Sequence, residues 1–105
     1  MRHGLLRALV RIAALADQGK VRFTVKAFHE LAGLGLDASD ACEILSSLTM
    51  REFACRKRSE PTDEWLYVFM PRVAGTVLYV KLIARTDCVI ISFHEAVSEP
   101  EEDRA

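Results

Sequence analysis

The apolar residues of this chain change their period near residue 53. Before that point they recur every three or four positions, as they do on one face of a helix. After it they alternate or form short runs, as they do in strands. The predicted order is three helices followed by four strands. This order is typical of an α+β fold, in which the N-terminal helices pack on one face of a four-stranded antiparallel sheet.

The first two predicted helices lie before Gly35. The first ends before Gly19, and its apolar residues at helical spacing are Leu5, Leu6, Leu9, Ile12, Ala13 and Ala16. Thr24 can cap the second helix, and Gly33 and Gly35 can end it. The predicted buried stripe of this second helix consists of Phe28, Leu31 and Ala32.

The third predicted helix begins after Asp37, which is a favourable N-cap residue. The side chains that we expect to point inward from it are Ala41, Cys42, Leu45 and Leu48. Thr49 and Glu52 then have the spacing of a capping box, which predicts one more short helical turn.

Two hairpins account for the four predicted strands. FACRKR (53–58) and EWLYVFM (64–70) flank a polar turn region and form the first hairpin. TVLYVKLIAR (76–85) and CVIISFHEA (88–96) are joined by the short Thr86–Asp87 turn and form the second. The strand at 64–70 is apolar on both faces, which predicts a central place in the sheet.

Length and charge predict one globular domain with an acidic tail. The chain has 105 residues, of which 50% are hydrophobic and 28% charged, so we expect a single domain over residues 1–97. Residues 98–105 are mostly acidic and include Pro100, and we expect them to be disordered. The rest of the chain is therefore mildly basic, although the net charge is −1. This balance permits an anionic partner without requiring one.

Several classes of site are disfavoured by the composition. Cys42, Cys55 and Cys88 form no CxxC pair, and their odd number fits a reduced, cytoplasmic location. The histidines lack the spacing of metal ligands, so we expect no metal site. Arg7 and Arg11 interrupt the apolar N-terminal stretch, which favours an amphipathic helix over a signal peptide. No apolar run approaches about 20 residues, so we expect no membrane span.

Side-chain alternation divides the predicted sheet into two faces. In the strand at 76–85, the core face carries Leu78, Val80, Leu82 and Ala84, and the opposite face carries Val77, Tyr79, Lys81, Ile83 and Arg85. In the last strand, the core face is predicted to carry Val89, Ile91 and Phe93, and the opposite face Ile90, Ser92 and His94. The first hairpin adds the cations Arg56, Lys57 and Arg58.

A face that mixes Tyr, Lys, Arg and His is suited to RNA. Cations offset phosphate charge, and aromatic rings stack on unpaired bases. RNA cleavage by the 2′-hydroxyl group needs a base, an acid and cations for the developing charge. His and Tyr can serve the first two roles, and Lys and Arg the third.

The same pattern also allows a more ordinary interpretation. Lys and Arg on an open sheet face are usually solvated, and a lone histidine is more often structural than catalytic. Trp65, Tyr67 and Phe69 share one face of their strand and can be core residues rather than a platform for bases.

Five segments of the chain carry a more specific signal. They are GKVRFTVKAFHELAGLGLD (19–37), LTMREF (48–53), Trp65 with VFMPR (68–72), Gly75 with VLYVKL (77–82), and VIISFHE (89–95). In this order and spacing they resemble the motility quorum-sensing regulator (MqsR) toxins. The resemblance implies a RelE-like microbial ribonuclease fold that cleaves mRNA, often at GCU, without a metal ion or another cofactor. It also implies a cognate antitoxin with a helix-turn-helix domain.

Carried over by position, the resemblance is incomplete. Tyr79 matches the family's strand tyrosine, which is implicated in catalysis, and Lys81 matches the lysine two residues later. Cys55 stands where the family has a catalytic lysine, and Lys57 on the same strand face can substitute for it. Two further family positions, a glutamine and a lysine, are occupied here by Leu66 and His94.

The leading hypothesis is therefore the toxin of a type II toxin–antitoxin system, acting as an endoribonuclease on mRNA. Tyr79, His94 and Lys57 are the predicted catalytic residues. The predicted RNA-binding residues are Lys81, Arg85, Arg56 and Arg58. Two alternatives are a non-catalytic RNA- or protein-binding module of the same fold and an enzyme that depends on Cys55.

Overall fold

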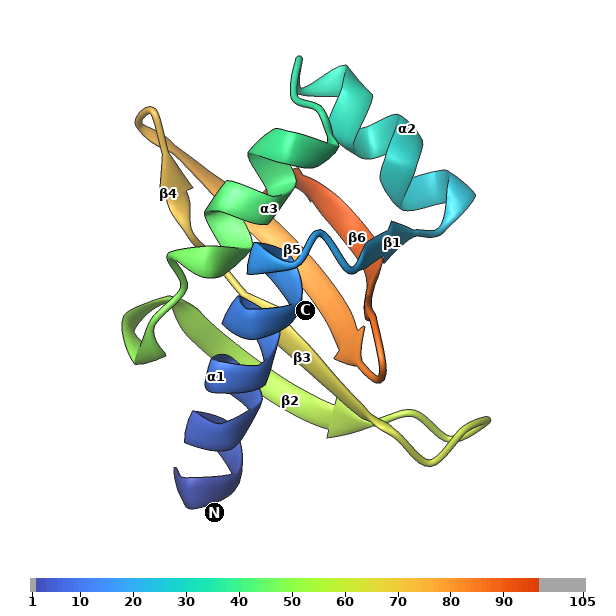
Figure 1. The fold of residues 1–105 in the computed structure, drawn as a ribbon. Helices are drawn as coiled ribbons and strands as arrows, with labels where there is room; N and C mark the ends of the chain where they lie inside the picture. The colour runs from blue at the N-terminus through green and yellow to red at the C-terminus, as the bar shows by residue number, and fades with distance from the viewer. Residues whose placement is uncertain (1, 97–105) are drawn as a thin grey trace, which may run out of the picture.

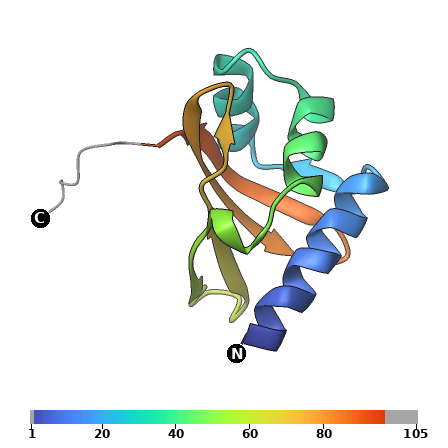
Figure 2. The same ribbon diagram turned by 90° about the vertical axis from the view of Figure 1, so that its left-hand side faces the viewer.

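Three helices cover one face of a mixed sheet in the computed structural model (Figures 1 and 2). They are α1 (Arg2–Asp17), α2 (Val25–Gly33) and α3 (Ala38–Ser46). The structure describes residues 2–96, so the predicted tail at 98–105 lies outside the described residues. None of the described helices is long and apolar enough to cross a membrane.

The sheet contains the four predicted strands and two short ones. The strands are β1 (Val21–Phe23), β2 (Phe53–Arg58), β3 (Trp65–Phe69), β4 (Arg72–Val73), β5 (Thr76–Ala84) and β6 (Cys88–Glu95). Their order is β1-β6-β5-β3-β2, and β4 pairs with β5. The predicted hairpins β2–β3 and β5–β6 are confirmed, as is the central place of β3.

The prediction of a four-stranded, wholly antiparallel sheet needs one correction. β1 extends the sheet and runs parallel to β6, with Val21 opposite Cys88 and Phe23 opposite Ile90. β4 adds a further antiparallel pair with β5. Both added strands are too short to show a period of two in the sequence. The α+β class and the placement of the helices on one face are confirmed.

The predicted polar residues cap the N-termini of α2, α3 and the short helical turn that follows α3. The Thr24 hydroxyl group accepts a hydrogen bond from the Ala27 N–H, and Asp37 and Asp40 form a reciprocal capping box before and within α3. Thr49 and Glu52 form another capping box at the short 3-10 helix η1 (Met50–Glu52).

The buried face of α2 differs from the prediction. Ala27 and Leu31 are buried, whereas Phe28 and Ala32 are exposed. The helix is rotated because its polar pair Lys26 and Glu30 also contacts β6 through hydrogen bonds. A smaller difference occurs in α1, where Leu6 is exposed and Leu15 is buried instead.

The core lies between the helices and the sheet. Its largest fully buried side chains are Phe69, Phe93, Ile12, Leu31, Leu45, Leu82 and Ile90. Trp65, Tyr67 and Phe69 share this core face, as alternation predicts, and they pack with helix residues rather than standing on the open face. The opposite face of β5 and β6 carries no helix, and Tyr79 and His94 lie on it.

Candidate active site

Tyr79 and His94 form a stacked pair on the open face of the sheet. The two residues are direct partners across β5 and β6. Their ring centroids are 5.1 Å apart and the ring planes differ by 12°. Lys81 is the direct partner of Ser92 on the same two strands. The predicted sharing of one face by Tyr79, Lys81, Ser92 and His94 is therefore confirmed.

A β-bulge in β6 lies just before this pair. Lys81 is opposite Ser92, but the next residue, Leu82, is opposite Ile90, so Ile91 has no partner in β5. An extra residue of this kind shifts the alternation of side chains on one side of the bulge. Residues after the bulge keep the predicted face, and residues before it exchange faces.

The bulge corrects the predicted core of β6. Cys88 and Ile90 are fully buried, and Phe93, on the far side of the bulge, is fully buried too. The prediction that Val89 and Ile91 belong to the core and Ile90 to the open face was wrong. With regular alternation, these three buried residues could not all face the helices, because 90 and 93 differ by an odd number.

The Tyr79 hydroxyl group is a proton donor at neutral pH. Burial raises the pKa of Tyr79 above its usual value of 10.0, and the charge of the nearby Cys55 thiolate would raise it further. The phenol therefore keeps its proton in the neutral range. It can donate a hydrogen bond or a proton to a reacting oxygen atom.

The His94 ring is oriented by the backbone. Its Nδ1 atom lies 2.9 Å from the Glu95 carbonyl oxygen, which can only accept a hydrogen bond. Nδ1 therefore carries the proton, and in the neutral ring Nε2 is the proton acceptor. The stacked pair thus combines one donor and one acceptor on the same surface.

Lys81 lies in a row of side chains that crosses the open face. Cys55, Val68, Lys81 and Ser92 are successive partners across β2, β3, β5 and β6. In the described part of the chain no carboxylate pairs with Lys81. Lys81 as a whole is half-buried, so its side chain is partly exposed and available to an anion on the open face.

Two residues of α2 reach this face and were not predicted. The Lys26 ammonium group donates hydrogen bonds to the Ser92 hydroxyl group at 3.0 Å and to the Ile91 carbonyl at 3.3 Å. The Glu30 carboxylate accepts a hydrogen bond from the Phe93 N–H at 2.9 Å and pairs with Lys26 at 3.1 Å. We call Lys26 and Glu30 the bulge clamp, because they bind the carbonyl of the extra residue Ile91 and the backbone N–H of Phe93 just after it.

The charge of Glu30 is maintained by these contacts. Burial alone would raise the pKa of Glu30, but the Phe93 N–H and the Lys26 ammonium group outweigh it and hold that pKa below its usual value of 4.5. A Lys and a Glu four residues apart are common on solvated helices, so the sequence carried no signal of a link to β6.

The remaining predicted cations of β2 lie on different faces. Lys57 is opposite Leu66 on the open face, but β3 separates its strand from β5, which corresponds to about 10 Å. Cys55, not Lys57, shares the row of Lys81. Arg56 is opposite Tyr67 and therefore projects on the helix side, away from the stacked pair.

Arg58 projects on the helix side, and Arg85 lies past the end of β5. Arg58 is opposite Trp65, and its guanidinium carbon lies 4.5 Å from the centre of the Trp65 ring. Arg85 follows β5 and donates two hydrogen bonds to the Glu64 carboxylate, at 2.7 and 2.8 Å. The structure therefore brings together Tyr79, His94 and Lys81, and it separates them from the three predicted arginines.

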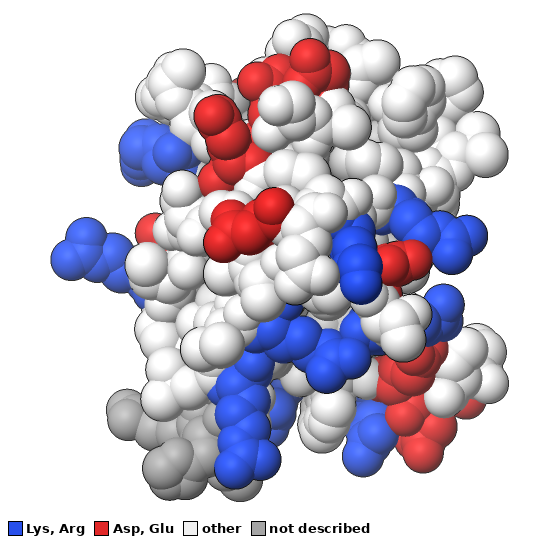
Figure 3. Space-filling view, viewed as in Figure 1, with Lys and Arg blue, Asp and Glu red and all other residues white. Residues whose placement is uncertain are grey.

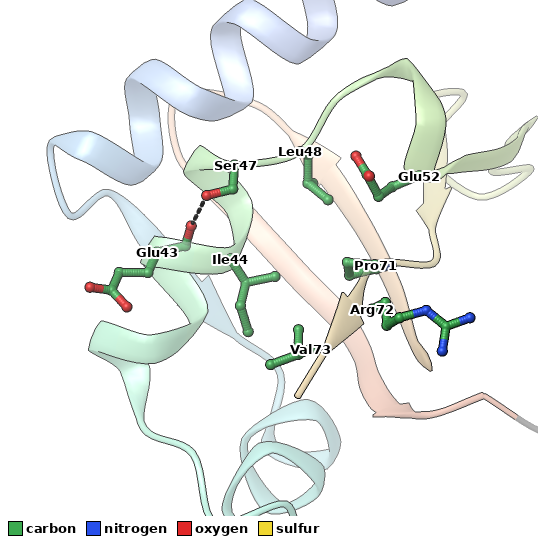
Figure 4. A pocket seen from close by; sticks show the side chains of 8 residues that line it. All are labelled: Glu43, Ile44, Ser47, Leu48, Glu52, Pro71, Arg72 and Val73. Carbon is green, nitrogen blue, oxygen red and sulfur yellow. Dashed lines mark hydrogen bonds between the residues drawn. The ribbon is translucent and has the colours of Figure 1, made fainter. Parts of the chain in front are cut away.

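A pocket of about 300 Å³ occupies another part of the molecule, between α3, η1 and β4 (Figure 4). It is lined by Glu43, Ile44, Ser47, Leu48, Glu52, Pro71, Arg72 and Val73. Figure 4 shows the Arg72 guanidinium group pointing away from the apolar lining residues. None of the predicted site residues lines this pocket, so it is not part of the candidate active site.

Comparison with known proteins identifies the family of the chain. Residues 6–95 match the family described as motility quorum-sensing regulator, toxin of MqsA. The mRNA interferase toxin MqsR of Escherichia coli (strain K12) is 29% identical over 89 residues, which cover 83% of this chain and 90% of that protein. Both strands of the stacked pair lie within the family match. The chain therefore belongs to the motility quorum-sensing regulator family of toxins.

Proposed function

We propose that this chain is the toxin of a bacterial type II toxin–antitoxin system and that it is a metal-independent endoribonuclease that cleaves mRNA. The observation that carries the proposal is the stacked Tyr79–His94 pair beside Lys81. A donor, an acceptor and a cation on one open face are the groups that RNA cleavage by the 2′-hydroxyl group requires. The family membership and the printed name of the Escherichia coli relative support the same activity.

In the proposed reaction His94 acts as the base. Its Nε2 atom takes the proton of the ribose 2′-hydroxyl group, whose oxygen attacks the adjacent phosphorus atom. Tyr79 donates its proton to the departing 5′-oxygen atom, and the bond between phosphorus and that oxygen breaks. The products are a 2′,3′-cyclic phosphate and a free 5′-hydroxyl group. A proton returning from His94 to Tyr79 through water restores both side chains.

Lys81 stabilises the charge that develops on the phosphate oxygens. Lys81 lies two residues after Tyr79 on the same face of β5, and its ammonium group has no competing carboxylate within residues 2–96. Lys57, across β3, is better placed for a neighbouring phosphate than for the scissile one. No group in this scheme requires a metal ion.

A cytoplasmic location and an antitoxin partner are parts of the proposal. The substrate class places the toxin where mRNA is translated. The family description names a toxin of MqsA, which supports a cognate antitoxin for this chain too. We expect that antitoxin to carry a helix-turn-helix DNA-binding domain.

The test is cleavage of purified mRNA by the isolated chain in the presence of a chelator. We expect fragments that end in 2′,3′-cyclic phosphate, and we expect RNA with 2′-deoxyribose at the cleavage position to stay intact there. RNA that is bound but never cut, at high protein concentration and without antitoxin, would contradict the enzyme and favour the non-catalytic binding module.

A further inference from the structure

A second cationic surface lies on the helix side of the sheet, away from the Tyr79–His94 pair. Five residues form what we call the arginine cluster: Arg7 and Arg11 of α1, Arg56 and Arg58 of β2, and Arg85 after β5. Figure 3 shows Lys and Arg side chains gathered in a band across the lower half of this face, over α1 and the hairpin β2–β3. Like charges gathered from three elements indicate a surface that meets an anion.

Two arginines of the cluster line a pocket of about 300 Å³, and the other three contact residues of its wall. Arg7 and Arg11 line it from α1, and Glu64 and Trp65 line it from the sheet. Glu64 binds Arg85, and Arg11 donates two hydrogen bonds to the Arg85 carbonyl at 2.6 and 3.0 Å. These contacts fix one side of the pocket.

The Trp65 ring stacks on the guanidinium groups of Arg56 and Arg58 and leaves their N–H donors free of the ring. The guanidinium carbons of Arg56 and Arg58 lie 4.3 and 4.5 Å from the centre of its ring. Stacking uses the flat face of a guanidinium group, so the N–H groups in its plane stay available for phosphate oxygens. Arg58 donates one of them to the Asp63 carbonyl, and the same nitrogen atom lies 3.5 Å from the Asp63 carboxylate. Within residues 2–96 the Arg56 and Arg7 guanidinium groups make no hydrogen bond and no ion pair.

The position of β2 links this surface to the candidate active site. β2 is an edge strand, and its alternation places Lys57 on the open face and Arg56 and Arg58 on the helix face. Only β3 lies between β2 and β5. An RNA strand that runs from Tyr79 across the open face would therefore pass Lys57 and reach the β2 edge. There it would meet cations on both faces of the sheet.

We propose that the arginine cluster binds the sugar–phosphate backbone of the RNA substrate where it passes round the β2 edge. This inference rests on the proposed function for the identity of the anion. Planar guanidinium groups bind phosphate through paired N–H donors, and the neighbouring residues Lys57 and Arg56 present cations on the two faces of one edge strand. The cluster would then extend the length of RNA that the protein contacts without taking part in the chemistry.

The experiment compares binding of two RNAs whose 2′-hydroxyl groups are all methylated, so that neither can be cleaved. One has about 12 nucleotides and the other about four, the range of site sizes for single-strand binders. The double variant Arg56→Ala/Arg58→Ala should bind the longer RNA on the order of tenfold more weakly at 0.1 M salt. The plot of the logarithm of the association constant against the logarithm of the salt concentration has a negative slope. The magnitude of this slope should fall by about 0.7 for each lost phosphate contact. Affinity for the short RNA should change little.

Two further variants make the result interpretable. Arg22→Ala/Arg51→Ala removes the same charge at positions outside the cluster and should bind the longer RNA nearly as well as wild type. Arg7→Gln removes a side chain that has no bonded partner within residues 2–96, so it should weaken binding without affecting folding. Circular dichroism melting checks that every variant is folded.

The outcomes separate this inference from the proposed function. Equal affinity of the wild type, Arg7→Gln and Arg56→Ala/Arg58→Ala proteins for the longer RNA would overturn the inference, even if the wild type cleaves RNA. Binding that depends on the cluster, without cleavage of ordinary RNA, would support the inference and remove the proposed activity. Tighter, cluster-dependent binding of poly-glutamate than of RNA would assign the surface to an acidic protein and overturn the inference.

Discussion

At the scale of single residues, the proposed mechanism depends on one hydroxyl group. Tyr79→Phe keeps the ring that stacks on His94 and removes only the proton donor. We expect the rate of RNA cleavage under single-turnover conditions to fall roughly 10²- to 10⁴-fold, the usual contribution of a general acid. RNA affinity should change little. The chain has one other tyrosine, Tyr67, which packs in the core on the opposite face, so Tyr67→Phe is the matched control.

The pH dependence gives a second measurement of the same residue. Burial raises the pKa of Tyr79, so the proton donor should be lost only as the pH rises above the usual tyrosine value of 10.0. Wild-type activity should therefore decline on that alkaline side, and Tyr79→Phe should lack the decline. A Tyr79→Phe protein with wild-type rates at neutral pH would contradict the role of the hydroxyl group.

Alternation alone was enough to place the central residues of the site. Tyr79 and Lys81 lie on a regular strand, and Ser92 and His94 follow the bulge, so their faces could be predicted from the sequence. Arg56 and Arg58 were assigned to the wrong surface. Three consecutive cations show that this segment is positively charged. The face of the sheet on which each side chain lies depends on the pairing of β2 with β3.

At the scale of the elements, the bulge decides which isoleucine supports the core. Ile90→Ala and Ile91→Ala make the same chemical change at adjacent positions, but Ile90 is fully buried and Ile91 only half-buried. We expect Ile90→Ala to lower the free energy of unfolding by about 2–5 kcal/mol and Ile91→Ala by about 1 kcal/mol or less. Urea denaturation followed by circular dichroism measures both. A larger loss for Ile91→Ala would contradict the position of the bulge.

The bulge clamp should make stability depend on pH. The pKa of Glu30 is lower in the folded chain than its usual value of 4.5, so its ionised form stabilises the fold above that pH. This contribution disappears as the pH falls through the lowered pKa. We expect Glu30→Gln to lower the free energy of unfolding by about 1–2 kcal/mol at pH 7. The cost should approach zero in acid.

Glu43 provides the control for this prediction. It lies on α3, and its carboxylate makes no hydrogen bond within the described residues. Glu43→Gln should therefore leave the free energy of unfolding almost unchanged across the same pH range. If Glu30→Gln lowers the free energy of unfolding by the same amount at neutral and at acid pH, the charge of Glu30 does not stabilise the contact between α2 and β6.

At the scale of the whole molecule, the order of the helices and long strands could be predicted from the sequence. The pairing that adds β1 to the edge of the sheet could not. The period change near residue 53 and the two hairpins are local patterns, and the structure confirms them. The parallel pairing of β1 with β6 joins residues that are far apart in the chain, and no local pattern reports it. The link from α2 to β6 was missed for the same reason.

The pairing of β1 with β6 also concerns the moment at which the candidate active site forms. β6 is the last of the described strands to be synthesised, yet β1, β5 and the bulge clamp all need it as a partner. A fragment of residues 1–87 should therefore show no cooperative urea transition, whereas the full chain should show one; a cooperative fragment would contradict this dependence. While its last strand is still inside the ribosome, the nascent toxin lacks a formed cleavage face. We expect such a nascent chain to leave RNA intact until β6 has emerged and paired with β5.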